Sequence, residues 1–248
     1  MCKPFSAIYR AGAFEGMRMT SRSLHAAIFD MDGLMFDTER LSSRCWHQIG
    51  RELGLNITEE LLSQARGLTG PEYRSFFERS LGESLDYDTA NARKRALYWS
   101  YIAEEGLQLK PGLIALLNFL KNEGICIGMA TATRQGIADR YLDLTGVRPY
   151  FDFFVFGDQV ASGKPNPEIF LLAAKQVGAA PEICMVLEDS INGVKAGISG
   201  GFHTIMIPDL TQPTPEIAAR LSAKCESLEQ IISYLEAHRD AVTQKFYL

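Results

Sequence analysis

Several features are missing from this sequence of 248 residues, and each absence excludes a class of protein. No apolar stretch approaches the roughly 20 residues of a membrane-spanning helix, so we expect no membrane segment. No run of lysine and arginine is present, and the formal net charge is −5, which argues against a nucleic-acid-binding protein. The five cysteines lack CxxC or metal-ligand spacing, and this odd, scattered set favours a reducing compartment over a disulfide framework.

The N-terminal stretch 1–23 likewise lacks the continuous apolar core of a secretory signal. It carries four basic side chains among small and hydroxylated residues. A targeting presequence is one interpretation, and a flexible N-terminal extension is the other. We favour the extension, and we expect a cytoplasmic protein.

From residue 24 onward, short apolar runs alternate with helical patterns. The runs are rich in β-branched or aromatic residues, which is typical of buried strands. We expect strands at His25–Met31, Ile125–Thr131, Phe153–Gly157, Ile183–Asp189 and His203–Pro208. Helices are expected around an apolar face at Leu113, Leu116, Leu117 and Leu120, and over Asn166–Gly178. This alternation predicts an α/β fold with a Rossmann-like parallel sheet and helices on both faces.

One interval, 38–110, breaks the alternation and contains only helical patterns. We expect helices at roughly Glu39–Leu53, Thr58–Ala65, Pro71–Leu81 and Asp86–Glu105. An all-α segment inserted after the first strand predicts a second, helical subdomain. The predicted organisation is therefore a core domain over 24–37 and 111–248, with a helical cap domain over 38–110.

Carboxylates follow two of the predicted strands. Asp30 and Asp32 come directly after the first strand, and Glu188 and Asp189 end the fourth. Each pair has an alternative reading, because Asp often caps the following helix. Capping could explain one acid of the second pair but explains both less easily, since adjacent buried acids are costly unless they are paired.

Complementary groups follow two other strands. Thr131 ends the second strand, where a hydroxyl beside unbonded backbone N–H groups can hold a phosphate oxygen, although it could equally cap the next helix. Lys164 lies between Gly163 and two prolines, which favours a fixed ammonium over a solvated loop lysine. The carboxyl ends of parallel strands face one crevice, so these groups together predict a site for Mg²⁺ and phosphate.

The four motifs occur in an order that resembles the haloacid dehalogenase-like hydrolases, from Leu24 to about Leu235. They are DMDG at 30–33, the threonine of MATAT at 131, the lysine of GKPNP at 164 and LEDS at 187–190. The helical insert resembles the small cap of the subgroup that contains β-phosphoglucomutases and phosphatases. The resemblance implies a phosphoric monoester hydrolase that acts on a small phosphorylated substrate, commonly as a monomer.

The resemblance also implies the roles of the acids. Asp30 would attack phosphorus and form an aspartyl-phosphate, and Asp32 would be the general acid and base. Mg²⁺ would be held by Asp30, the backbone carbonyl of Asp32 and Asp189, with Glu188 positioning a water beside it.

Phosphate binding and cap closure are the remaining implied roles. Thr131, with the adjacent Ala132, and Lys164 would hold the phosphoryl oxygens. The cap would close over the rest of the substrate, and Glu39, Arg66 and Thr69 are the candidates for contacting it. Each of the three could instead be a solvated helix or loop residue.

Two departures from the mutase pattern favour a phosphatase acting on a sugar, polyol or nucleoside phosphate. β-Phosphoglucomutases usually carry a histidine shortly after the DT pair, whereas the corresponding stretch here, Asp37–Ser42, has none and the nearest histidine is His47. The mutase cap loop tends to present an arginine where Gly70 stands, although Arg66 and Arg74 flank this position. A phosphosugar mutase is the alternative, and a binding module without catalysis is a further one that the intact motifs argue against.

Overall fold

The computed structural model describes residues 23–66, 68, 70–82 and 85–248. Two predictions therefore concern residues that it leaves undescribed: the flexible extension, apart from residue 23, and the substrate role of Thr69. Within the described residues, no helix is both long enough and apolar enough to cross a membrane.

Six parallel strands form one sheet in the order β3-β2-β1-β4-β5-β6 within the described residues. The strands are β1 (Ala26–Phe29), β2 (Cys126–Ala130), β3 (Phe153–Val155), β4 (Cys184–Glu188), β5 (His203–Met206) and β6 (Ala223–Lys224). Every residue of β1, β2 and β4 is buried, as expected for central strands covered on both faces. The order reverses at β1, which has β2 on one side and β4 on the other, so the crevice of the sheet lies at its carboxyl end.

Helices cover both faces of the sheet, and alternate strand residues face them. In β1, Ala27 and Phe29 join the core beneath α5 (Leu113–Asn122), α6 (Gln135–Thr145) and α10 (Leu228–Ala237). Ala26 and Ile28 join the opposite core, beneath α7 (Glu168–Val177) and α8 (Ile191–Ser199). The short helix α9 (Pro215–Ala218) follows β5. The predicted α/β fold with a Rossmann-like sheet is confirmed.

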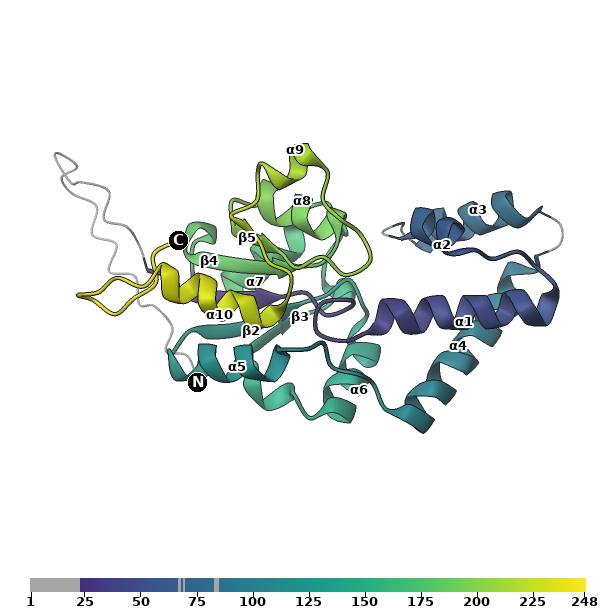
Figure 1. The fold of residues 1–248 in the computed structure, drawn as a ribbon, viewed down its shortest axis with the longest axis horizontal. Coiled ribbons are helices and arrows are strands. Elements are labelled where there is room, and N and C mark those ends of the chain that lie inside the picture. The colour runs from purple at the N-terminus through teal and green to yellow at the C-terminus, as the bar shows by residue number, and fades with distance from the viewer. Residues whose placement is uncertain (1–22, 67, 69, 83–84) are drawn as a thin grey trace.

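The interval after β1 is helical and extends away from one end of the sheet (Figure 1). Its helices are α1 (Thr38–Leu53), α2 (Glu59–Ala65), α3 (Gly70–Leu81) and α4 (Tyr87–Glu105), close to the predicted limits. They enclose a core of their own, in which the Trp46 and Phe77 rings stack with centroids 4.3 Å apart. Thr58 and Asp86 cap α2 and α4 by accepting hydrogen bonds from backbone N–H groups. The domain boundaries at 38 and 110 stay a prediction.

The differences from the expected elements lie at strand ends and at the C-terminal edge of the sheet. β1 ends at Phe29, so Asp30 and Met31 lie between the strand and the following turn rather than in the strand. β6, a strand of two residues, was not expected, because two residues carry no periodicity. The expected helical face of Leu113, Leu116, Leu117 and Leu120 is confirmed, since all four are buried in α5.

Candidate active site

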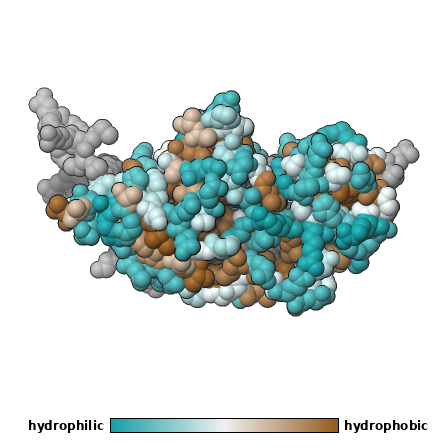
Figure 2. Space-filling model, viewed as in Figure 1, coloured by the Kyte–Doolittle hydropathy of each residue, from teal (hydrophilic) through white to brown (hydrophobic). Residues whose placement is uncertain are grey.

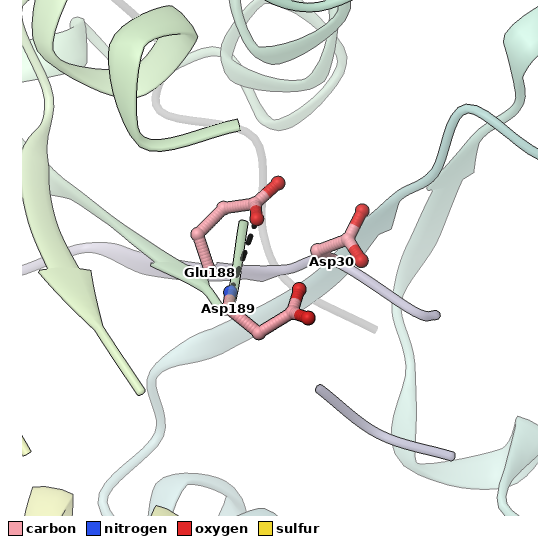
Figure 3. Close-up of side chains that lie close together, drawn as sticks. All are labelled: Asp30, Glu188 and Asp189. Atoms are coloured by element: carbon pink, nitrogen blue, oxygen red, sulfur yellow. Dashed lines mark hydrogen bonds between the residues drawn. The ribbon is translucent and has the colours of Figure 1, made fainter. Parts of the chain in front are cut away.

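The predicted acids meet at the carboxyl end of the sheet. Asp30 follows β1, Glu188 is the last residue of β4, and Asp189 follows it. One carboxylate oxygen from each of the three lies within 4.8 Å of the others, and all three residues are buried (Figure 3). The strand order brings them together, because β1 and β4 are neighbours in the sheet.

Crowded, buried carboxylates resist ionisation. Burial is the main cause that raises the pKa of Asp30 to about 8, and the charges of Glu188 and Asp32 add to it. Burial also raises the pKa of Asp189 well above its usual range, with further contributions from Glu188 and Asp30. The cluster therefore has the electrostatics of a site that is completed by a cation.

Lys164 supplies one cation. Its ammonium pairs with Asp30 and donates a 2.6 Å hydrogen bond to Oε1 of Glu188, with only 8% of its side chain exposed. Burial lowers the pKa of Lys164, but the attraction of the two carboxylates outweighs it and raises the pKa above the ordinary value. The solvated-loop reading of Lys164 is therefore excluded by its burial.

Glu188 is saturated by hydrogen bonds within the protein. Its Oε2 accepts from the N–H of Asp189 at 3.1 Å, and from the N–H and hydroxyl of Ser190 at 3.0 and 2.9 Å. Ser190 in turn caps α8 by accepting from the N–H of Gly193 at 3.1 Å. A Cβ on Gly193 would overlap the Glu188 carboxylate, so glycine is required there. Ser190 is therefore the N-cap of α8, so helix capping does not explain the buried carboxylate of Asp189.

Asp189 has an orphaned oxygen. Its buried Oδ1 accepts no hydrogen bond within the described part of the chain. A Cβ on Gly33, whose φ is +81°, would overlap Oδ2 of Asp189, so the turn after β1 is shaped around this carboxylate. An unsatisfied buried anion beside two other carboxylates fits a hard divalent cation such as Mg²⁺, which prefers oxygen ligands.

The Asp32 side chain belongs to a different set of contacts. Its Oδ2 accepts a 2.6 Å hydrogen bond from the Thr133 hydroxyl and lies 3.5 Å from that of Thr131. It is not among the carboxylates whose oxygens converge on the possible cation position. Burial raises the pKa of Asp32, and the hydrogen bond from Thr133 is the largest influence that lowers it.

Thr131 is buried at the end of β2. Its N–H donates to the carbonyl of Val155 at 3.0 Å, and its hydroxyl oxygen accepts from the N–H of Thr133 at 3.0 Å. It does not cap α6, which begins four residues later at Gln135 with no side-chain cap. The neighbouring Ala132 is exposed. The hydroxyls of Thr131 and Thr133 therefore face Asp32, and the exposed Ala132 lies between these two threonines.

A cavity of about 190 Å³ lies among the helices of the insert. We call it the insert pocket; its lining includes Glu39, Ser42, Trp46, Arg66, Tyr73 and Lys94. Glu39 connects it to the acid cluster, because its Cγ lies 3.4 Å from where a Gly33 Cβ would stand. Burial raises the pKa of Glu39, and the charge of Asp32 adds to this.

One buried polar atom of the insert pocket has no hydrogen-bond partner within the described residues. The buried Nε of Arg66 has no hydrogen bond within the described residues, although Nη2 pairs with Glu59. The Lys94 ammonium lies 5.6 Å from the Trp46 ring centre. Burial lowers the pKa of Lys94, and the attraction of Glu39 opposes this without outweighing it.

Outside the pocket, the α1 side of the molecule is largely hydrophilic on the face seen in Figure 2.

Sequence reasoning missed Thr133 and Lys94. Thr133 is adjacent to a recognised motif residue, and its approach to Asp32 depends on how the loop after β2 turns. Lys94 lies in the middle of α4, where a lysine ordinarily marks a solvated helix face. Only the packing of α4 against α1 brings it beside Glu39.

The chain matches the family model of a haloacid dehalogenase-like hydrolase over residues 24–201. The chain belongs to this family. A phosphorylated carbohydrates phosphatase from Thermotoga maritima is 35% identical over 183 residues, covering 73% of this chain and 84% of that protein. Hexitol phosphatase A from Escherichia coli is 30% identical over 217 residues, with coverage of 88% and 97%.

Solved structures of this family share the fold. A putative β-phosphoglucomutase from Thermotoga maritima superposes with a TM-score of 0.72 at 30% identity, covering 86% of this chain and 99% of that one. The predicted resemblance, including its subgroup, is confirmed, as is the prediction of a phosphoric monoester hydrolase.

Proposed function

We propose that the chain is a Mg²⁺-dependent phosphatase that hydrolyses a small phosphorylated sugar, polyol or nucleoside through an aspartyl-phosphate on Asp30. One observation carries the proposal: Asp30 pairs with the buried ammonium of Lys164 and faces Asp189, a carboxylate with one oxygen that has no partner in the described part of the chain. A cation and a phosphate that enter this crevice would complete its charge balance.

Asp30 and Asp32 have different roles in the proposed reaction. Asp30 attacks phosphorus while the bond to the leaving oxygen breaks, and Asp32 gives that oxygen its proton. Asp32 then takes a proton from the water that attacks the aspartyl-phosphate, which releases phosphate and regenerates Asp30. The hydrogen bond from Thr133 supports this role, because it orients the Asp32 carboxylate away from the acid cluster.

The remaining groups bind the phosphoryl group and the metal ion. Lys164 and the loop at Thr131 and Ala132 hold phosphoryl oxygens, and Glu188 fixes Lys164. Asp30, Asp189 and the Asp32 backbone carbonyl would hold Mg²⁺, with Glu188 beside them. When bound, the ion supplies positive charge that keeps the carboxylates ionised and neutralises phosphate.

The insert pocket supports a polyhydroxylated leaving group. Its Glu39 carboxylate can accept hydrogen bonds from a substrate, Lys94 and the Arg66 Nε can donate them, and the Trp46 and Tyr73 rings provide an apolar surface. Relatives named for carbohydrate and hexitol phosphates also favour such substrates. Phosphate release from these esters is therefore the activity that we propose.

A phosphosugar mutase is the second candidate, because a putative β-phosphoglucomutase has the same fold at 30% identity. The position of His47 weighs against it. This histidine contacts the Ile57 carbonyl and Glu59 and is not among the residues that line the insert pocket, whereas Ser42 is. Arg74 is likewise engaged by Asp88 and Glu78 on the surface.

One experiment separates these functions. The protein is incubated with Mg²⁺ and a panel of sugar, polyol and nucleoside monophosphates, and both phosphate release and isomer interconversion are followed by phosphorus NMR. We expect phosphate release that stops on chelation with EDTA and is absent in Asp30→Asn. Interconversion of hexose 1- and 6-phosphates without net phosphate release would identify a mutase instead.

A further inference from the structure

Four charged side chains meet where the helical insert joins the sheet. Asp37 precedes α1, Arg40 lies in its first turn, Lys110 lies in the return connection, and Asp209 follows β5. Lys110 Nζ lies 2.6 Å from Asp209 Oδ1 and 3.2 Å from Asp37 Oδ1. Arg40 pairs with Asp37 at 2.8 Å and with the same oxygen of Asp209. We call these four residues the hinge network.

The two connections of the insert are already joined to each other. The N–H of Asp37 donates to the Gln108 carbonyl at 3.0 Å, and that of Lys110 donates to the Met35 carbonyl at 2.9 Å. Phe36 and Leu109 form an antiparallel bridge between these bonds. The connections therefore move together, and the direction of the pair relative to the sheet depends on contacts from outside it.

Asp209 makes such a contact from the sheet side. Its side chain is 2% exposed, and its buried Oδ2 has no hydrogen-bond partner within the described residues. A buried, half-satisfied carboxylate stabilises a fold poorly, since its desolvation offsets the attraction of its partners. Its pairing with Lys110 and Arg40 does, however, require one orientation of the hinge. These observations therefore favour a role for Asp209 in fixing the orientation of the hinge rather than in stabilising the fold.

The hinge network also connects the two halves of the site. Arg40 of the network is next to Glu39 in α1, and Asp209 follows β5, the strand that pairs with β4, after which Asp189 stands. Glu39 belongs to the insert pocket and Asp189 to the acid cluster. A change in the hinge network therefore changes the separation of these two groups.

We propose that Asp209 is a positioning residue: by holding Lys110 and Arg40, it fixes the helical insert at the angle that aligns the insert pocket with Asp30. The predicted effect on catalysis rests on the proposed function, whereas the predicted effect on the orientation of the insert does not. A substrate that spans both halves depends on the alignment. A phosphoryl donor too small to reach the insert pocket does not.

The kinetic test compares two substrates in the full chain. Acetyl phosphate is the small donor, and the best sugar or polyol phosphate of the panel is the spanning one. We expect Asp209→Asn and Lys110→Met to lower kcat/KM about tenfold for the spanning substrate, and to leave acetyl phosphate within about twofold. Lys110→Arg, which keeps the charge, should restore the spanning substrate.

A matched control removes an ion pair that lies wholly within the insert. Glu105 joins α4 to Arg44 of α1 through two 2.8 Å hydrogen bonds. Glu105→Gln should leave the ratio of the two kcat/KM values unchanged. A parallel fall for both substrates in Asp209→Asn, or no fall in either, would overturn the positioning role.

Small-angle X-ray scattering tests the hinge without activity. We expect a larger radius of gyration in Asp209→Asn and Lys110→Met than in the wild type, and the wild-type value in Glu105→Gln. Arg40→Gln, at a position with 49% of the side chain exposed, serves if the buried variants do not fold, and should show the same increase. Wild-type scattering from every hinge variant refutes the proposal, whereas an inactive wild type refutes only the proposed function.

Discussion

The hydroxyl of Thr133 donates a 2.6 Å hydrogen bond to the carboxylate of Asp32. Burial raises the pKa of Asp32, and this hydrogen bond is the largest influence in the opposite direction. In the proposed mechanism Asp32 both gives and takes a proton, so its pKa sets the pH range of activity. Thr133 thereby adjusts the acid–base group without itself contacting the reacting bond.

Thr133→Val should move the pH optimum of kcat/KM to higher pH. Valine keeps the branched shape but cannot donate, and loss of a hydrogen bond to the carboxylate raises the pKa of Asp32 further. We also expect kcat near neutral pH to fall about tenfold. Thr133→Ser, which retains the hydroxyl, is the control, and an unmoved profile in the valine variant would break the link to Asp32.

Asp30→Asn should abolish turnover while leaving the fold intact. The amide is isosteric but is not a nucleophile, so we expect kcat to fall by at least about four orders of magnitude. Circular dichroism should match the wild type. Turnover near the wild-type rate would remove Asp30 as the nucleophile.

The same variant tests the electrostatics of the metal-free site. Burial first, and then Glu188 and Asp32, raise the pKa of Asp30 from 3.8 to about 8. The folded state thus holds this proton more tightly, and the resulting stability is complete below pH 3.8 and is lost as the pH rises to about 8.

Thermal unfolding in EDTA follows this titration. The Tm of the wild type should fall relative to that of Asp30→Asn as the pH rises through this window, because asparagine does not titrate. Near pH 8, added Mg²⁺ should raise the wild-type Tm more than that of the variant. A constant difference in Tm across the window would show that Asp30 does not titrate there.

Lys164→Met should destabilise the metal-free protein. It leaves Asp30 and Glu188 buried without their shared cation, and breaking a buried pair in this way costs about 3–5 kcal/mol. Urea unfolding at neutral pH measures the loss. Lys175→Met, at an exposed position in the last turn of α7, is the control and should change the free energy of unfolding by less than about 0.5 kcal/mol.

Lys94→Met and Glu39→Gln should change substrate preference rather than the chemistry at phosphorus. Each removes a polar group from the insert pocket, so we expect kcat/KM for a sugar phosphate to fall about tenfold. Acetyl phosphate turnover should change little. Arg93→Gln provides the control, since Arg93 pairs with Glu52 on the surface, and equal losses for both substrates would exclude a role in selectivity.

The sequence predicts the sheet site better than the insert pocket, for a physical reason. Asp30, Thr131 and Glu188 stand at or just beyond the carboxyl ends of adjacent strands, so the strand pattern and the rule for parallel sheets bring them together. The predicted convergence of Asp30, Lys164, Glu188 and Asp189 is what the structure contains, whereas their catalytic roles stay predictions.

The insert pocket depends on helix packing, which a single sequence specifies weakly. Arg66 was expected to contact substrate, and it does line the pocket, but its pairing with Glu59 was not expected. Lys94 belongs to no recognisable sequence motif. Its burial follows from the packing of α4 against α1, and no periodicity in the sequence encodes that packing.

The paired connections between Met35 and Lys110 carry a consequence for how the family diversifies. The chain leaves the sheet and returns to it at neighbouring points, and none of the clustered acids lies in the segment between them. The helical segment can therefore be lengthened, altered or exchanged as a block while the two ends stay joined. Under the proposed function, changes confined to this segment would alter substrate choice and leave the groups at the acid cluster unchanged.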